Sequence, residues 1–106
     1  MTKWFKDLVE DIGMKILHGP IVIYSDMVDN EGFTGFCIIE TSHIVLHVWD
    51  KVEKPFMQLD VYTCGPLDPY DVVANLDFFE PTRIEMKYLD RENGFTDIPV
   101  ENKDDV

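Results

Sequence analysis

Two short stretches of the sequence hold the residue types that carry out nucleophilic and acid–base chemistry. The first, residues 40–47, reads Glu-Thr-Ser-His-Ile-Val-Leu-His and places Ser42 at a tight junction between two expected strands, with His47 further along. The second, residues 60–65, reads Asp-Val-Tyr-Thr-Cys-Gly and ends with Cys64 before a glycine. A serine at such a junction is exposed, and its hydroxyl can reach the carbonyl group of the preceding residue. If the end of a neighbouring strand brings the cysteine close, a hydroxyl, an imidazole and a thiol are expected to lie together.

Each of these residues also has an ordinary structural interpretation. A serine in a hairpin corner is commonly a turn residue, and a lone cysteine is usually a small buried apolar side chain. A histidine on an alternating strand is more often held by hydrogen bonds than catalytic. His43 and His47 share one face of their strand, so a zinc site with Cys64 is an alternative, but the spacing matches no strong zinc pattern. The sequence contains no glycine-rich phosphate loop, no Gly-x-Ser-x-Gly motif and no paired Cys-x-x-Cys.

The elements that position these residues follow from the hydrophobic pattern. Apolar residues spaced three and four apart predict a helix over residues 3–17, and Asp68-Pro69 begins a second helix that Pro81 ends. The β-branched and aromatic runs predict five strands, over residues 21–27, 33–40, 43–49, 56–63 and 82–89. Short connections favour antiparallel pairing, so the predicted fold is α+β, an antiparallel β-sheet with two helices packed on one face.

The opposite face of this sheet stays open unless a second subunit or a ligand covers it. Aromatic side chains are expected there, which favours a homodimer. Residues 1–90 are expected to form a single domain. Residues 91–106 are acidic, with few apolar side chains to bury, and are expected to form a flexible tail.

Composition excludes several classes of function. The chain has 106 residues and a formal charge of −12, with a sequence pI of about 4.3. Such an acidic protein offers no surface for nucleic acid or for an anionic membrane, because both require clustered lysine and arginine. No apolar run approaches the roughly 20 residues that span a bilayer, the start does not read as a signal peptide, and two cysteines are too few for a disulfide scaffold. The sequence predicts a soluble cytoplasmic protein.

The order of the motifs resembles a known family. The run Thr-Ser-His-Ile-Val-Leu-His at residues 41–47, followed by Tyr-Thr-Cys-Gly-Pro-Leu-Asp-Pro at residues 62–69, is similar to the short prokaryotic-type S-adenosylmethionine decarboxylases. That family typically shows Glu-Ser-His, a His-Thr dipeptide four residues later, and then Thr-Cys-Gly before a helix. The resemblance covers roughly residues 32–89 and implies the α+β sandwich of these enzymes.

The resemblance implies a prosthetic group made from the chain itself. In the family the serine hydroxyl attacks the preceding carbonyl, here that of Thr41, and elimination and hydrolysis leave a pyruvoyl group at the new N-terminus, here Ser42. The resemblance also implies roles for three other residues. His47 assists processing, Thr34 replaces a second serine that assists processing in the family, and Cys64 donates a proton during decarboxylation. The activity implied is decarboxylation of S-adenosylmethionine for the synthesis of spermidine and other polyamines, by a dimer with its sites near the subunit contact.

Several positions depart from the family pattern. Thr41 replaces the family's glutamate, so cleavage is expected between Thr41 and Ser42. The family's Thr-x-Pro-Glu is Val-Trp-Asp-Lys at residues 48–51, and a lysine cannot accept hydrogen bonds from ribose hydroxyls as the glutamate does. Asp50 or Glu53 is the candidate replacement. The departures leave two alternatives: decarboxylation of another amine substrate such as ornithine or arginine, or a homologue that does not process itself and serves as a binding or structural protein.

Overall fold

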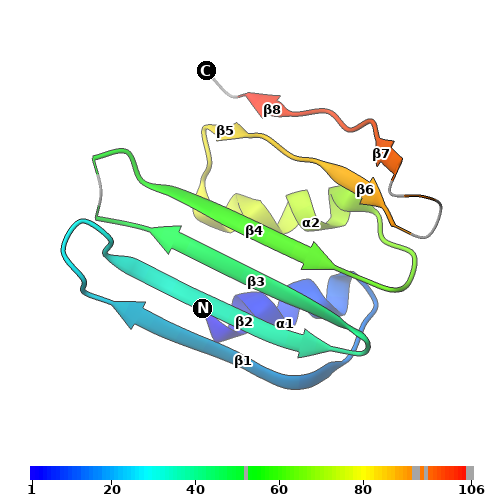
Figure 1. Cartoon of the computed structure of the whole chain (residues 1–106), viewed down its shortest axis with the longest axis horizontal. Helices are drawn as coiled ribbons and strands as arrows, with labels where there is room; N and C mark the ends of the chain where they lie inside the picture. The colour runs from blue at the N-terminus through cyan, green and yellow to red at the C-terminus, as the bar shows by residue number, and fades with distance from the viewer. Residues whose placement is uncertain (52, 92–93, 95, 105–106) are drawn as a thin grey trace.

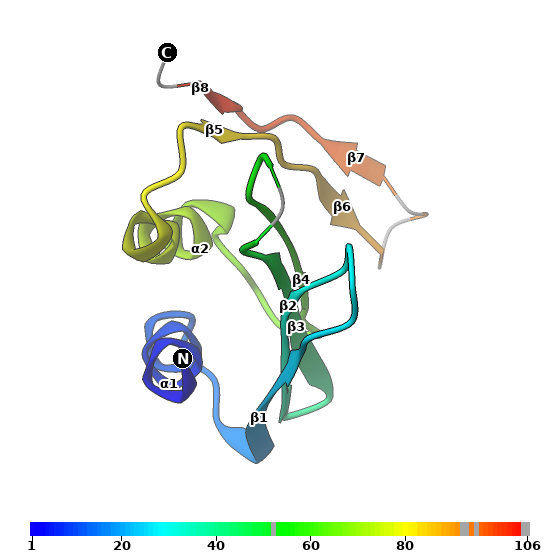
Figure 2. The same ribbon diagram turned by 90° about the vertical axis from the view of Figure 1, so that its left-hand side faces the viewer.

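A computed structural model describes residues 1–51, 53–91, 94 and 96–104 of the chain. Its first four strands form one antiparallel sheet in the order β1-β2-β3-β4, and both α-helices lie on the same face of that sheet (Figures 1 and 2). The predicted α+β fold is therefore confirmed. The elements are α1 (Thr2–Asp11), β1 (Ile16–Ser25), β2 (Gly32–Ile39), β3 (Ser42–Trp49), β4 (Phe56–Tyr62), α2 (Pro69–Asn75), the 3₁₀ helix η1 (Leu76–Phe79), β5 (Arg83–Ile84), β6 (Tyr88–Asp90), β7 (Thr96–Ile98) and β8 (Lys103–Asp104).

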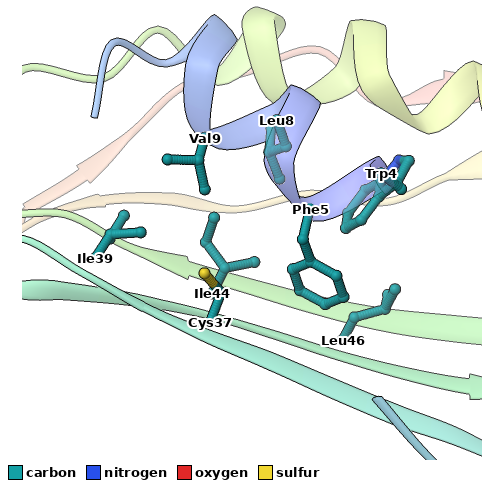
Figure 3. Packing of buried hydrophobic residues seen from close by; sticks show 8 residues of the cluster. All are labelled: Trp4, Phe5, Leu8, Val9, Cys37, Ile39, Ile44 and Leu46. Carbon is teal, nitrogen blue, oxygen red and sulfur yellow. The ribbon is translucent and has the colours of Figure 1, made fainter. Parts of the chain in front are cut away.

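The core lies between α1 and the two central strands. Figure 3 shows the apolar stripe of α1 pointing at β2 and β3, where most side chains of the cluster are almost fully buried. Gly35 makes this contact possible, because a Cβ atom at that position would lie 2.6 Å from the Phe5 ring. The sheet face under α1 is thus sealed. The cluster contains Trp4, Phe5, Leu8 and Val9 of α1, Cys37 and Ile39 of β2, and Ile44 and Leu46 of β3.

The N-terminal helix is shorter than the sequence pattern predicts. The expectation of a helix over residues 3–17 is wrong beyond Asp11, because Gly13 has a φ of +73°, which a right-handed helix cannot accommodate. Ile16, predicted on the helix, instead begins β1 and pairs with Ile39. The strand expected at residues 21–27 therefore begins five residues earlier.

The chain after β4 also differs from the prediction. The helix expected from Asp68 begins as predicted, with the Asp68 side chain accepting a hydrogen bond from the N–H of Tyr70, and the remainder is the short 3₁₀ helix η1. The strand expected over residues 82–89 is wrong as a single element: it is interrupted between β5 and β6, which pair with β8 and β7 and not with the main sheet. The interruption leaves the N–H of Met86 bonded to the Asn102 side chain. Among the residues that the structure describes, no helix is both long and apolar enough to cross a membrane.

Candidate active site

The connection between β2 and β3 is a two-residue turn. Ile39 pairs with Ser42 at the end of the ladder, so Glu40 and Thr41 alone reverse the chain. Thr41 has a φ of +53°, in the left-handed region that β-branched residues rarely adopt. Its hydroxyl donates a hydrogen bond of 2.7 Å to the Glu40 carbonyl oxygen. The residue whose carbonyl precedes Ser42 is therefore strained, at a cost of about 1–2 kcal/mol.

Cys64 reaches this turn from the end of β4. Because His43 pairs with Tyr62 in the ladder between β3 and β4, the chain that leaves β4 passes beside the turn. The backbone N–H of Cys64 donates to Ser42 Oγ at 3.0 Å, and Cys64 Sγ donates to the Thr41 carbonyl oxygen at 2.9 Å. The expectation that Ser42 is exposed is wrong: it is 7% exposed, because its side chain lies on the helix-covered face of β3 and is contacted by Cys64, whereas the cysteine is accessible to solvent. The thiol and the serine hydroxyl thus meet at the Thr41–Ser42 peptide bond.

The two cysteines differ in environment. Cys37 is fully buried in the core, and burial raises the pKa of its thiol because the interior disfavours a thiolate. A thiol held in that form is a poor nucleophile and a poor metal ligand. Cys64, with its sulfur exposed beside the turn, is therefore the cysteine available to a substrate.

His47 and Thr34 form a second, separate pair. They are cross-strand partners on β3 and β2, and Thr34 Oγ1 lies 2.8 Å from His47 Nδ1. His47 is five residues beyond Ser42 on the same strand, so it points to the opposite face of the sheet and lies roughly 16 Å along it. Within one chain, the structure brings Cys64 to Ser42 but does not bring His47 to them.

The two acidic candidates for substrate binding lie at the end of the sheet where His47 is found. Asp50 directly follows β3, and Glu53 lies in the loop before β4; both are exposed. Beside them Trp49 stacks on Phe56, with ring centroids 4.4 Å apart and planes 10° from parallel, and its indole N–H bonds to Asn30. This aromatic pair provides a flat apolar surface next to the two carboxylates.

Sequence reasoning missed a group of side chains around Tyr62. Its ring is stacked on His43, with centroids 5.2 Å apart, and the guanidinium of Arg91 lies 4.6 Å from its centroid. Its hydroxyl is 3.9 Å from Cys64 Sγ, and Asp60 Oδ2 is 3.6 Å from His43 Nε2. Alternation along residues 56–62 already placed Tyr62 on the open face, but the cross-strand register with His43 was needed to reveal the stack.

The residues considered for zinc are not arranged as a metal site. His43 lies next to Asp60 and Tyr62, whereas His47 bonds to Thr34 on a different part of the sheet. In the part of the chain that the structure describes, no group of three or more histidine, cysteine, aspartate or glutamate side chains is placed to hold a metal ion.

Comparison with known proteins identifies the family of this chain. Residues 1–92 match the family described as S-adenosylmethionine decarboxylase, so the chain belongs to that family. Proteins named "S-adenosylmethionine decarboxylase proenzyme" are similar to it: one from Pyrobaculum arsenaticum is 42% identical over 66 residues (58% of this chain, 50% of the relative), and one from Methanococcus vannielii is 33% identical over 70 residues (64% and 54%). The chain thus spans about half the length of these curated relatives. No solved structure matches it.

The residues at the turn fit the prosthetic group that this family implies. A pyruvoyl group arises from a serine whose hydroxyl attacks the preceding carbonyl, and Ser42 follows a carbonyl that already accepts a hydrogen bond from a thiol. The Ser42 hydroxyl is held by the N–H of Cys64. The donor set at this turn is therefore chemically suited to forming the group in place.

Proposed function

We propose that the chain is a pyruvoyl-dependent S-adenosylmethionine decarboxylase of polyamine (spermidine) biosynthesis, made as a proenzyme that cleaves itself between Thr41 and Ser42. One observation carries the proposal: Cys64 Sγ lies 2.9 Å from the Thr41 carbonyl oxygen while the N–H of the same residue contacts Ser42 Oγ. Family membership gives the reaction class, and this contact gives a physical reason for the bond to react.

Cleavage would begin with attack of Ser42 Oγ on the carbonyl carbon of Thr41. An ester forms, the C–N bond between Thr41 and Ser42 breaks, and the proton that leaves the hydroxyl is taken up by the nitrogen of residue 42. Negative charge develops on the carbonyl oxygen during the attack, and the Cys64 S–H is already directed at that oxygen. The left-handed conformation of Thr41 favours the reaction further, since breaking the turn releases its strain. The Cys64 N–H keeps the serine oxygen in place in the folded turn.

The mature enzyme would use the same cysteine a second time. A pyruvoyl group at residue 42 would supply an electron-withdrawing ketone for decarboxylation of an amine substrate. Cys64, exposed beside residue 42, is placed to donate the proton that replaces the lost carboxylate. No other described cysteine fills that role, because Cys37 is fully buried.

The separation of His47 from Ser42 supports a homodimer. If His47 and Thr34 assist cleavage, their place on the open face means that they act on the turn of a second copy, not on their own. The open face also carries exposed apolar side chains, Ile23 at 62%, Ile38 at 43% and Phe56 at 50% exposure, which a partner subunit would cover.

The substrate pocket would lie near Asp50, Glu53 and the stack of Trp49 on Phe56. Carboxylates accept hydrogen bonds from ribose hydroxyls, and a flat aromatic surface suits a purine. A second candidate is decarboxylation of ornithine or arginine. Lys51 cannot accept hydrogen bonds from ribose hydroxyls as the family's glutamate does, and the charge of −12 attracts basic amino acids.

Intact-mass spectrometry of the purified full chain tests the proposal. The wild type should split at Thr41–Ser42 into two fragments, the larger one with a blocked N-terminus, and Ser42→Ala should stay whole. A wild type that remains uncut after long incubation would refute processing and leave the non-catalytic homologue as the explanation. Carbon dioxide release from S-adenosylmethionine, ornithine and arginine then separates the substrates, and release from only the last two would reject the first choice.

A further inference from the structure

Both hydrogen bonds that tie Cys64 to the turn use oxygen atoms that cleavage separates from residue 42. The acyl group of Thr41 moves to Ser42 Oγ, and elimination then breaks the Cβ–Oγ bond, so Oγ leaves as a carboxylate oxygen of Thr41. Water supplies the ketone oxygen at residue 42, and the nitrogen leaves as ammonia. Both oxygens then belong to the carboxylate of Thr41, which is no longer joined to residue 42, so neither contact ties Cys64 to the new N-terminus. The thiol needs another partner if it is to stay in place for the second reaction.

The hydroxyl of Tyr62 is the partner that remains. It accepts a hydrogen bond from Cys64 Sγ at 3.9 Å, a long contact in the uncleaved chain, where the Thr41 carbonyl is the nearer acceptor. Tyr62 ends β4, two residues before the cysteine, so its backbone is fixed by pairing with His43 and does not depend on the peptide bond that is cut.

The ring of Tyr62 is also held independently of the turn. The imidazole of His43 stacks on it with planes 14° from parallel, and the Arg91 guanidinium lies 4.6 Å from the ring centroid. Asp60 in turn lies 3.6 Å from the His43 imidazole. Stacking and cation–π contacts of this kind restrict a ring to one orientation, which keeps its hydroxyl directed at the thiol.

We propose that Tyr62 is a positioning residue for Cys64: once cleavage has detached the Thr41 carboxylate from residue 42, the thiol turns to the Tyr62 hydroxyl, which holds it beside the new N-terminus. The inference rests on the proposed function and extends it to a residue outside the cleavage site. The inference distinguishes the two roles of Cys64: loss of the Tyr62 hydroxyl should barely change the rate of self-cleavage but should lower the rate of decarboxylation.

Tyr62→Phe tests the inference, because it keeps the ring and its stack and removes only the hydroxyl. Cleavage followed by intact mass should proceed within about twofold of the wild type. In the cleaved protein, iodoacetamide should alkylate Cys64 about three- to tenfold faster, and kcat for S-adenosylmethionine should fall by a similar factor at unchanged KM, the size of one lost hydrogen bond. Buried Cys37 does not interfere with the alkylation.

Two controls make the result specific. Tyr24→Phe removes a hydroxyl from a ring near Lys51, away from the turn, and should change neither the cleavage rate nor the alkylation rate of Cys64. In the uncleavable Ser42→Ala chain, Tyr62→Phe should alter alkylation by less than about twofold, because the Thr41 carbonyl still holds the thiol. His43→Ala should reproduce the faster alkylation in the cleaved chain by loosening the ring.

The outcomes separate the inference from the proposed function. If the wild type cleaves but cleaved Tyr62→Phe matches it in alkylation rate and kcat, the positioning role is overturned while the decarboxylase stands. If the wild type never cleaves, the proposed function fails and the inference falls with it. A large rise in KM alone would assign Tyr62 to substrate binding and would also reject the positioning role.

Discussion

Replacing Thr41 by glycine removes a backbone strain that lies on the residue whose carbonyl is attacked in the proposed self-cleavage. Threonine at a φ of +53° costs about 1–2 kcal/mol relative to an unstrained conformation, whereas glycine adopts this region freely. If attack and cleavage release the strain, glycine lowers the energy of the starting state alone. The barrier then rises by the same 1–2 kcal/mol, and cleavage should slow by about 5- to 30-fold.

The assay is the intact mass of full chains sampled over time after purification. Thr41→Ala keeps the left-handed strain but loses the hydroxyl bond to Glu40, so it should cleave within a few-fold of the wild type. Glu80→Gly is the matched control for strain, because Glu80 has a φ of +50° at the end of η1, away from the turn. It should leave the cleavage rate unchanged. Cleavage of Thr41→Gly at the wild-type rate or faster would refute the argument that strain drives the reaction.

The site and the core give three more predictions. Cys64→Ala should slow self-cleavage about 10-fold or more, because it removes the hydrogen-bond donor to the Thr41 carbonyl oxygen. Cys64→Ser keeps a donor and should cleave faster than the alanine variant. Equal cleavage rates of the two variants in an intact-mass time course would exclude a role for the donor. Gly35→Ala should lower the free energy of unfolding by about 1–3 kcal/mol in urea melts, because the new methyl group would lie 2.6 Å from the Phe5 ring. Gly65→Ala is the control: the nearest atom to its new methyl group is 3.5 Å away, so its free energy of unfolding should be close to that of the wild type. In the folded chain, iodoacetamide should modify Cys64 well before Cys37, because burial raises the pKa of the Cys37 thiol; peptide mapping that finds equal labelling would contradict the buried position.

The fold could be predicted from the sequence where patterns are strong and local. Alternation along residues 43–49 correctly predicted which side chains of β3 share a face, and short connections correctly predicted the antiparallel pairing. The end of α1 was missed because the apolar spacing continues through Ile16, and only the positive φ of Gly13 ends the helix. The strand predicted over residues 82–89 was wrong as a single element, because its alternation is real but its backbone bonds to distant residues, such as Asn102.

The candidate site was predictable in its members but less so in its geometry. The position of Ser42 at a tight hairpin follows from the pattern, whereas the left-handed backbone at Thr41 does not, since threonine is disfavoured there. An odd separation of five residues already places Ser42 and His47 on opposite faces of a strand. The 2.9 Å contact of Cys64 depends on the register between β3 and β4, which is a tertiary property that single-residue preferences do not contain.

The order of the strands has a consequence for the timing of synthesis. The cysteine that contacts the turn is encoded 22 residues after the serine, and it arrives only when the last strand of the sheet has docked. A nascent chain that has emerged from the ribosome only as far as β3 therefore lacks Cys64, whose thiol contacts the Thr41 carbonyl oxygen. Under the proposed self-cleavage, maturation would wait until the sheet is complete, and a truncated translation product would be left intact instead of being cut into fragments.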